Sequence, residues 1–295
     1  MITGGLGAVP FPAWEPHPDV WIVIGLFAVG YATAVVRLGP RLSPAGQPVV
    51  SRFQVTCWSL GVFAMWLASD WPIHDVAEQS LYSAHMVQHL IFTLVVAPLL
   101  LLGTPAWLLR WILSPPWLFH AVRWMARFLP AVILYNLVLV LFHWPAMVDL
   151  TLGNGLAHFV AHVIIVVSSL IVWLPILSPL PEIPRLVPVA QMVYLFLQSV
   201  VPTIPASFLT FGQTPLYRVY EGLPHLYGAT TLQDQQIAGL IMKLGAGLLI
   251  WGIIAVVFFR WASEEERADR SLDPPGWQDL EQQLNAPSPR SQQVR

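Results

Sequence analysis

Residues 81–102 read LYSAHMVQHLIFTLVVAPLLLL and contain no Asp, Glu, Lys or Arg. A transmembrane helix needs about 20 predominantly apolar residues to cross roughly 30 Å of hydrocarbon, and this run is long enough. We therefore expect it to span a membrane as a helix. Its two histidines, His85 and His89, need an explanation, because polar side chains inside a membrane are costly and usually functional.

The composition of the whole chain is typical of a membrane protein. Of its 295 residues, 56% are hydrophobic and 10% are charged, whereas a soluble domain carries about 25% charged residues. The net charge of -2 gives no reason to expect a nucleic acid as partner. The single cysteine, Cys57, excludes a disulfide framework. The first expected partner is therefore the lipid bilayer.

The sequence predicts an all-α fold, a polytopic membrane bundle of seven transmembrane helices. The fourth span has the shortest apolar core, and an interfacial helix over Trp117–Phe128 is expected to lead into it. Pro98 and Pro202 are expected to kink their helices. The seven expected spans are Val20–Val36, Phe53–Ala68, Leu81–Leu102, Leu129–Phe142, Leu156–Leu177, Val187–Ile204 and Gln235–Phe259.

Basic residues predict the orientation, because Lys and Arg concentrate in cytoplasmic loops. With seven crossings, Arg218 is the one arginine that falls on the side holding Asp70, Asp75, Glu78, Asp149, Glu221 and Asp234. We therefore expect the N-terminus outside and the C-terminus in the cytoplasm. The expected cytoplasmic arginines are Arg37, Arg41, Arg52, Arg110, Arg123, Arg127, Arg185, Arg260, Arg267, Arg270, Arg290 and Arg295.

Three regions follow from this topology. Residues 1–19 form an outer N-terminal segment, residues 20–261 form the transmembrane domain, and residues 262–295 form a cytoplasmic tail. The tail is charged and contains four prolines. We expect it to be disordered, because it has little apolar surface to offset the entropy of ordering.

The histidines gather toward the outer side in this topology, and only His120 is cytoplasmic. Four of them form two pairs, His85 with His89 and His158 with His162, each with the spacing His-x-x-x-His. Residues i and i+4 of a helix share one face. Both pairs begin near the outer end of their spans, within roughly 12 Å of the surface. The two pairs could supply four nitrogen ligands to one metal ion, or two nitrogen ligands to each of two metal ions.

Imidazole is a good ligand for copper, zinc and iron. His85, His89, His158 and His162 are therefore candidate metal ligands, and His143 and Met242 are further candidates. Alternatively, these histidines bond to neighbouring carbonyls or line a wet cavity, while the methionine only packs. Axial ligation of haem by the histidines also stays open at this point.

Other polar residues have two interpretations. Asp70, Asp75 and Glu78 precede the third span, where they either favour a helix N-terminus, or support the metal ligands or capture a cation. Lys243 lies inside the seventh span and needs a partner, for which Asp149 and Asp234 are candidates.

The chain has no Walker motif, no Gly-x-Ser-x-Gly and no His-Glu-x-x-His. No enzyme signature is present, so we expect a protein without catalytic activity.

Three stretches carry a resemblance to the CtaG family, the multi-pass assembly factors of caa-type cytochrome c oxidases. They cover most of the chain between Val20 and Phe259 when taken with the seven-span plan. Within them, Gln88, Asp234 and Gln235 are expected to support the ligands or the fold. The stretches are Ser83–His89 with Ala97–Pro105, His143–Pro145 with the His158/His162 pair, and Asp234–Met242.

The resemblance implies a bacterial plasma membrane protein that helps to produce an active haem–copper oxidase, and whose partner is an oxidase subunit. The predicted function is therefore an assembly factor that binds copper near the outer face and assists metallation. A haem-binding electron carrier with two histidine ligands is the alternative, and a strong Soret absorption would favour it. A metal transporter is disfavoured, because the cytoplasmic halves of the spans hold few polar residues.

Overall fold

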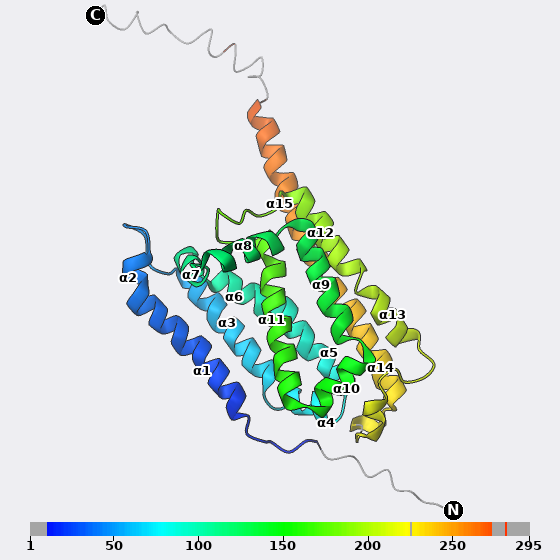
Figure 1. The fold of residues 1–295 in the computed structure, drawn as a ribbon. Coiled ribbons are helices and arrows are strands. Elements are labelled where there is room, and N and C mark those ends of the chain that lie inside the picture. Colours follow the sequence, from blue (N-terminus) through cyan, green and yellow to red (C-terminus); the bar gives the residue numbers. More distant parts are fainter. Residues whose placement is uncertain (1–10, 225, 273–280, 282–295) are drawn as a thin grey trace, which may run out of the picture.

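The computed structural model describes residues 11–224, 226–272 and 281. Throughout these ranges the chain forms helices joined by loops, so the prediction of an all-α fold is confirmed (Figure 1). The elements are α1 (Pro18–Thr33), η1 (Ala34–Leu38), α2 (Gly39–Leu42), α3 (Arg52–Ser69), α4 (Ile73–Gln79), α5 (Tyr82–Leu90), η2 (Ile91–Val96), α6 (Ala97–Gly103), α7 (Ala106–Ile112), α8 (Pro116–Met125), α9 (Phe128–Phe142), α10 (Pro145–Gly153), α11 (Gly155–Leu177), α12 (Pro188–Val200), α13 (Thr203–Phe211), η3 (Arg218–Gly222), η4 (Leu226–Gly228), α14 (Thr231–Leu240), η5 (Ile241–Gly245) and α15 (Ala246–Leu272).

Five continuous helical stretches are long and apolar enough to cross a membrane: Pro18–Leu42, Tyr82–Gly103, Gly155–Leu177, Pro188–Phe211 and Thr231–Asp269. The pair α8 and α9, bent by 86°, would make a sixth. The chain is therefore a multi-pass membrane protein with five to six candidate spans, where seven were expected. The expected span that is missing from this set is the second one, α3. Its first residues include Arg52 and Gln54, which lower its apolar character.

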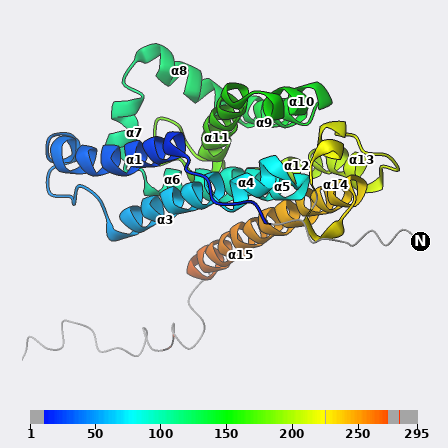
Figure 2. The same cartoon turned by 90° about the horizontal axis from the view of Figure 1, so that it is seen from below.

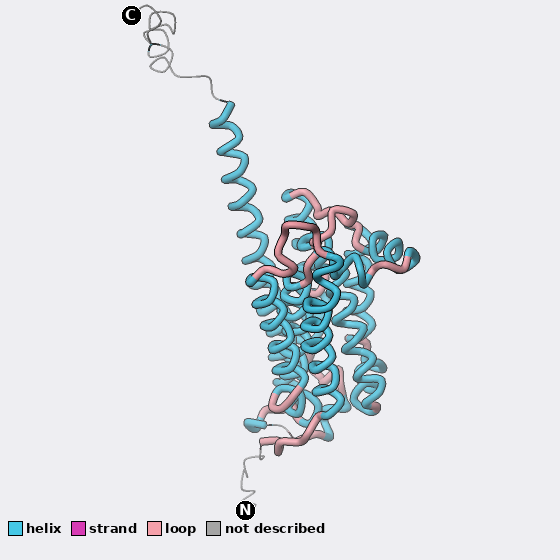
Figure 3. Tube along the Cα trace, turned by 90° about the vertical axis from the view of Figure 1, so that its left-hand side faces the viewer, coloured by secondary structure: helices cyan, strands magenta, loops and turns pink. Residues whose placement is uncertain are grey.

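The long helices run roughly along one axis, as Figure 1 and Figure 3 both show. The short helices α4 and α10 lie at one end of this bundle, while α2, α7 and α8 lie at the other (Figure 1). Asp75 and Glu78 belong to α4, whereas Arg110 belongs to α7 and Arg123 to α8. Asp75 and Glu78 thus lie at the opposite end of the bundle from Arg110 and Arg123.

The stretch from α5 through η2 to α6 and the helix α11 form the centre of the bundle. Both have half of their most apolar window buried, whereas the α1 window is 11% buried. Helix α1 lies at the edge of the bundle in Figure 1 and beside α3 in Figure 2, the view from below. Helix α1 packs mainly on α3, and the Tyr31 hydroxyl donates a hydrogen bond to the Gly103 carbonyl at 2.8 Å. The centre is therefore rigidly packed, and α1 is a peripheral helix.

The two prolines lie at irregularities of their helices. Pro98 follows the π-helical turn η2, and Pro202 lies at the break between α12 and α13. Both positions agree with the inability of proline to donate an intrahelical hydrogen bond. At the C-terminal end, α15 continues to Leu272 and extends beyond the bundle (Figure 3). The first part of the expected disordered tail is thus helical. Residues 273–280 and 282–295 lie outside the described residues.

Candidate metal centre

Helix α4 lies at the α10 end of the bundle, and Asp70 ends α3 just before it. The Asp70 carboxylate accepts hydrogen bonds from the indoles of Trp21 (2.8 Å) and Trp66 (2.7 Å) and from the backbone of Trp71 (2.8 Å). Burial raises the pKa of this carboxyl, but the three hydrogen bonds outweigh burial and the net pKa lies below its usual value. Asp70 therefore ties α1 and α3 to the turn that leads into α4.

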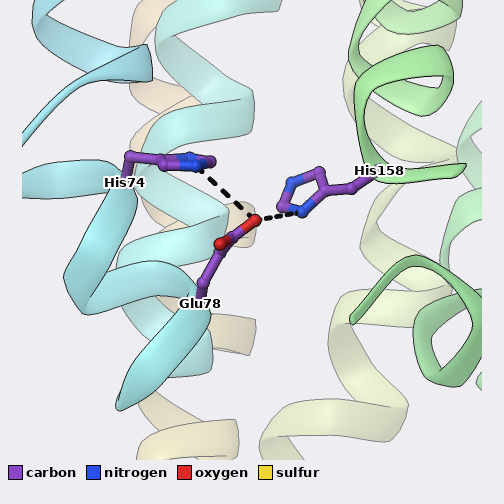
Figure 4. A group of neighbouring side chains, drawn as sticks. All are labelled: His74, Glu78 and His158. Carbon is purple, nitrogen blue, oxygen red and sulfur yellow. Dashed lines mark ion pairs between the residues drawn. The ribbon is translucent and has the colours of Figure 1, made fainter. Parts of the chain in front are cut away.

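Two residues one helical turn apart, His74 and Glu78, project from α4 toward His158 of α11 (Figure 4). The Glu78 carboxylate pairs with His74 Nε2 at 3.5 Å and also with His158 Nδ1. One ligand atom from each of the three residues lies within 4.8 Å of the other two. Two imidazoles and one carboxylate at this spacing can hold a transition-metal ion.

The remaining histidines of the cluster continue from this group toward the middle of the bundle. His158 Nε2 lies 3.0 Å from His162 Nε2, and the His162 ring lies 5.5 Å from the ring of His89. The His85 and His89 rings are 4.2 Å apart. The structure thus brings together the two histidine pairs that the sequence singled out. Whether all four bind a metal remains a prediction.

His17 covers the cluster from the segment before α1. Its ring lies 5.1 Å from the His74 ring, and its Nε2 atom lies 3.1 Å from Asp75 Oδ2. Gln79 donates a further hydrogen bond to Asp75 at 3.3 Å. Asp75 therefore positions the histidine that covers the site.

The protonation states of the α4 residues suit metal binding. Burial lowers the pKa of His74; the Glu78 carboxylate raises it in part, and the net pKa stays below its usual value. For Glu78, burial raises the pKa, but the hydrogen bond from His158 and the charge of His74 outweigh burial, so the net pKa is lowered. At neutral pH these shifts favour a neutral imidazole beside an ionised carboxylate, the forms that coordinate metals.

Gln88 holds the His74 ring in place. Its side-chain nitrogen lies 3.1 Å from His74 Nδ1 and donates to the Ala68 carbonyl at 2.7 Å. Gln88 is completely buried, so its side chain has little freedom to turn. This contact joins the end of α3, the helix α4 and the helix α5 at the candidate centre.

A cavity of about 390 Å³ opens beside the group; we call it the outer cavity. His74, Glu78, His158 and His162 line its polar end, and apolar residues of α1 and α11, such as Ile24 and Val163, line the rest. The cavity connects the candidate metal centre with the space between α1 and α11. An ion bound by the group would therefore lie at a cavity wall rather than inside a closed core.

Other candidates from the sequence lie away from this group. Asp234 accepts hydrogen bonds from the backbone of Tyr82 and Ser83 at the start of α5, and Gln235 accepts one from the backbone of Leu216. Both support the fold. His143 and Met242 line a separate, smaller cavity. The Lys243 ammonium lies 5.7 Å from the centre of the Phe211 ring, and its pairing with Asp149 or Asp234 is not among the ion pairs of the described residues.

Sequence reasoning did not identify His74 as a ligand, and it interpreted Glu78 either as a helix-end charge or as a group that supports or captures a cation. The signal was present as the spacing His74-x-x-x-Glu78, which repeats that of the two histidine pairs. It was overlooked because α4 has seven residues and lies outside every expected span. The outer-loop residue His225 lies outside the described residues.

The fold and the site together define a multi-pass α-helical membrane protein with a buried histidine cluster and a candidate metal centre. The family model for the cytochrome c oxidase caa3 assembly factor (Caa3_CtaG) matches residues 29–264, and the chain belongs to this family. The resemblance carried by the three sequence stretches is thereby confirmed. No curated protein and no solved structure matches the chain. His74, Glu78 and His158 lie within the matched range, whereas His17 precedes it.

Proposed function

We propose that this protein is a non-enzymatic assembly factor of the bacterial plasma membrane that binds copper near the outer face and assists metallation of a haem–copper oxidase subunit. The observation that carries the proposal is the group of His74, Glu78 and His158, whose ligand atoms lie within 4.8 Å of one another. Membership in the caa3 assembly factor family supplies the client, an oxidase whose active site needs copper.

The proposed topology has seven spans, with α3 and the α8–α9 pair added to the five continuous ones. Helix α3 has 18 residues, which at 1.5 Å per residue is about 27 Å, close to the thickness of the hydrocarbon. It lies between α1 and α6, both of which it contacts along the bundle axis (Figure 1). Seven crossings place α4 and the metal group outside, where the acidic end of the bundle is expected.

The donor set favours copper or zinc over calcium and magnesium, because imidazole nitrogen dominates it. One carboxylate among the ligands offsets part of the charge of a divalent ion, which lowers the cost of holding that ion in a partly buried place. The Nε2 atom of His162 lies 3.0 Å from Nε2 of His158, the ring nitrogen that does not face Glu78. Because the centre lies at a cavity wall, a bound ion stays within reach of a client that approaches from the membrane or from outside.

The proposal is tested by metal analysis of protein purified in detergent, loaded with Cu(II) and freed of excess metal. Wild-type protein should retain copper at this centre. His158→Ala should remove that ion, and Glu78→Gln should weaken binding roughly tenfold or more, because the anionic ligand is lost. His120→Ala is the matched control, since this exposed residue lies on α8 at the other end of the bundle.

Unchanged copper content in His158→Ala would contradict the proposed centre. A strong Soret band in the purified wild-type protein would instead favour the haem-binding alternative. Oxidase activity in cells, compared at matched expression, should fall with His158→Ala and stay unchanged with His120→Ala.

A further inference from the structure

A second cavity, which we call the inner chamber, is separate from the outer cavity and shares no lining residue with it. Its volume is about 60 Å³, and its walls come from α5, η2, α9, α11 and the η5–α15 stretch. Four residues with ligand atoms line it: Met86, His89, His143 and Met242. His74, Glu78 and His158 do not belong to its walls. The inner chamber is therefore a separate place with its own donors.

Two nitrogen atoms at the inner chamber have no hydrogen-bond partner. These are Nε2 of His89 and Nε2 of His143, both buried. His143 Nδ1 lies 2.8 Å from the Leu139 carbonyl, which can only accept, so Nδ1 carries the proton and Nε2 carries a lone pair. Leaving such a buried acceptor unsatisfied costs free energy. A donor or a metal ion in the chamber would remove this cost.

The two other donors are thioethers. Met86 and Met242 are 3% and 5% exposed, and they approach from α5 and from η5, two elements in contact. Thioether sulfur is a poor hydrogen-bond acceptor but a good ligand for soft ions, Cu(I) above all. The residues that line the inner chamber include no Asp, Glu, Lys or Arg. A neutral donor set in an apolar place favours a monovalent ion, because a second positive charge would be costly there.

We propose that the inner chamber is a second metal site, specific for a soft monovalent ion such as Cu(I), with two imidazoles and two thioethers as ligands. The outer group differs from it in chemistry, because Glu78 gives that group an anionic oxygen ligand. The His89 ring lies 5.5 Å from His162 and 4.2 Å from His85. The two sites are thus adjacent, joined by a continuous row of imidazoles.

Silver(I) tests the proposal, because it is soft, monovalent and inert to oxidation. Wild-type protein in detergent, loaded with silver(I), should show sulfur ligands by X-ray absorption. Met86→Leu combined with Met242→Leu should lose one silver ion per chain together with the sulfur signal. Leucine nearly conserves the volume of methionine, and such exchanges are well tolerated in packed cores, so the fold should survive. Met65→Leu is the matched control, because that buried residue lines the outer cavity.

His143→Phe provides a second variant, since it removes the lone pair while filling the same space, and it should also lose one silver ion. Glu78→Gln should keep the sulfur signal, so failure of the outer centre and failure of this proposal are distinguishable. A wild-type protein without sulfur ligands to silver would overturn the proposal. An unchanged signal in the double methionine variant would do the same, and the chamber would then hold water that bridges the two imidazoles.

Discussion

The Asp234 carboxylate lies 2.6 Å from the backbone nitrogen of Tyr82, the first residue of α5, although the two residues are 152 positions apart. It also accepts a hydrogen bond from the Ser83 nitrogen at 3.2 Å. A carboxylate at this position satisfies donors that the helix cannot use and favours its positive end. Helix α14 thus fixes the start of the helix that carries His85 and His89.

Asp234→Ala should destabilise the protein by about 1–3 kcal/mol, because it leaves two backbone N–H groups without an acceptor. Asp234→Asn should recover part of this loss, since its side chain still accepts a hydrogen bond. The measurement is the midpoint of thermal unfolding in detergent. Asp149→Ala on α10, an exposed position, is the control and should leave the midpoint unchanged. Equal midpoints for all these variants would show that the contact contributes nothing.

Gln88→Leu should weaken copper binding at the outer group roughly 10–100-fold, the usual effect of removing a residue that holds a metal ligand. The buried amide lies against His74 Nδ1, so its loss frees the imidazole to turn. A copper titration of the purified variant measures the effect. Gln213→Leu, at an exposed position whose hydrogen bond goes to the Phe211 carbonyl, serves as control. Wild-type affinity in Gln88→Leu would mean that His74 is held by other contacts or does not bind the ion.

The sequence predicted the helices that carry the site better than the site itself. Spacing within a single helix placed His158 and His162 on one face. The positions of the apolar runs placed this pair at a depth similar to that of His85 and His89. The contact of α4 with α11 depends on tertiary packing between segments far apart in the chain. The spacing of residues within one helix cannot predict such packing. His74 and Glu78 were therefore not recognised as partners of His158, and Asp234 was interpreted as a possible partner of Lys243 rather than of α5.

Gly103→Ala should destabilise the bundle by about 1–3 kcal/mol, as expected for an extra methyl group in a packed contact. A Cβ atom at this position would lie 2.6 Å from the Trp58 backbone nitrogen, so α3 and α6 would have to separate. Gly25→Ala on α1 is the matched control, because a Cβ there meets nothing within 4 Å. The midpoint of thermal unfolding in detergent, measured for both variants, tests this prediction. A lower midpoint for Gly25→Ala than for Gly103→Ala would contradict this packing.

Cysteine labelling in intact cells tests the proposed topology, using Cys57→Ser as background. Cysteines replacing the exposed residues Asp149 and Glu221 should react with a reagent that cannot cross the membrane. Those replacing Arg41, Arg123 and Arg267 should react only after the membrane is opened. The expectation rests on the separation of acidic and basic residues to opposite ends of the bundle. Finding positions 149 and 123 on the same side would rule out seven spans.

The histidines of α5 give the sharpest distinction between the two sites. His85 Nδ1 and His89 Nε2 are buried without a hydrogen-bond partner, so removing both side chains takes away polar groups that cost free energy in a membrane helix, and folding should survive. Replacing both with alanine should lower the copper content by one ion per chain and yield an oxidase deficient in active-site copper. The group of His74, Glu78 and His158 should keep its ion.

Adding His158→Ala should then remove all bound copper, while His120→Ala should change neither copper content nor oxidase activity. Full activity and unchanged copper in the His85/His89 variant, at matched expression, would show that these two residues only pack.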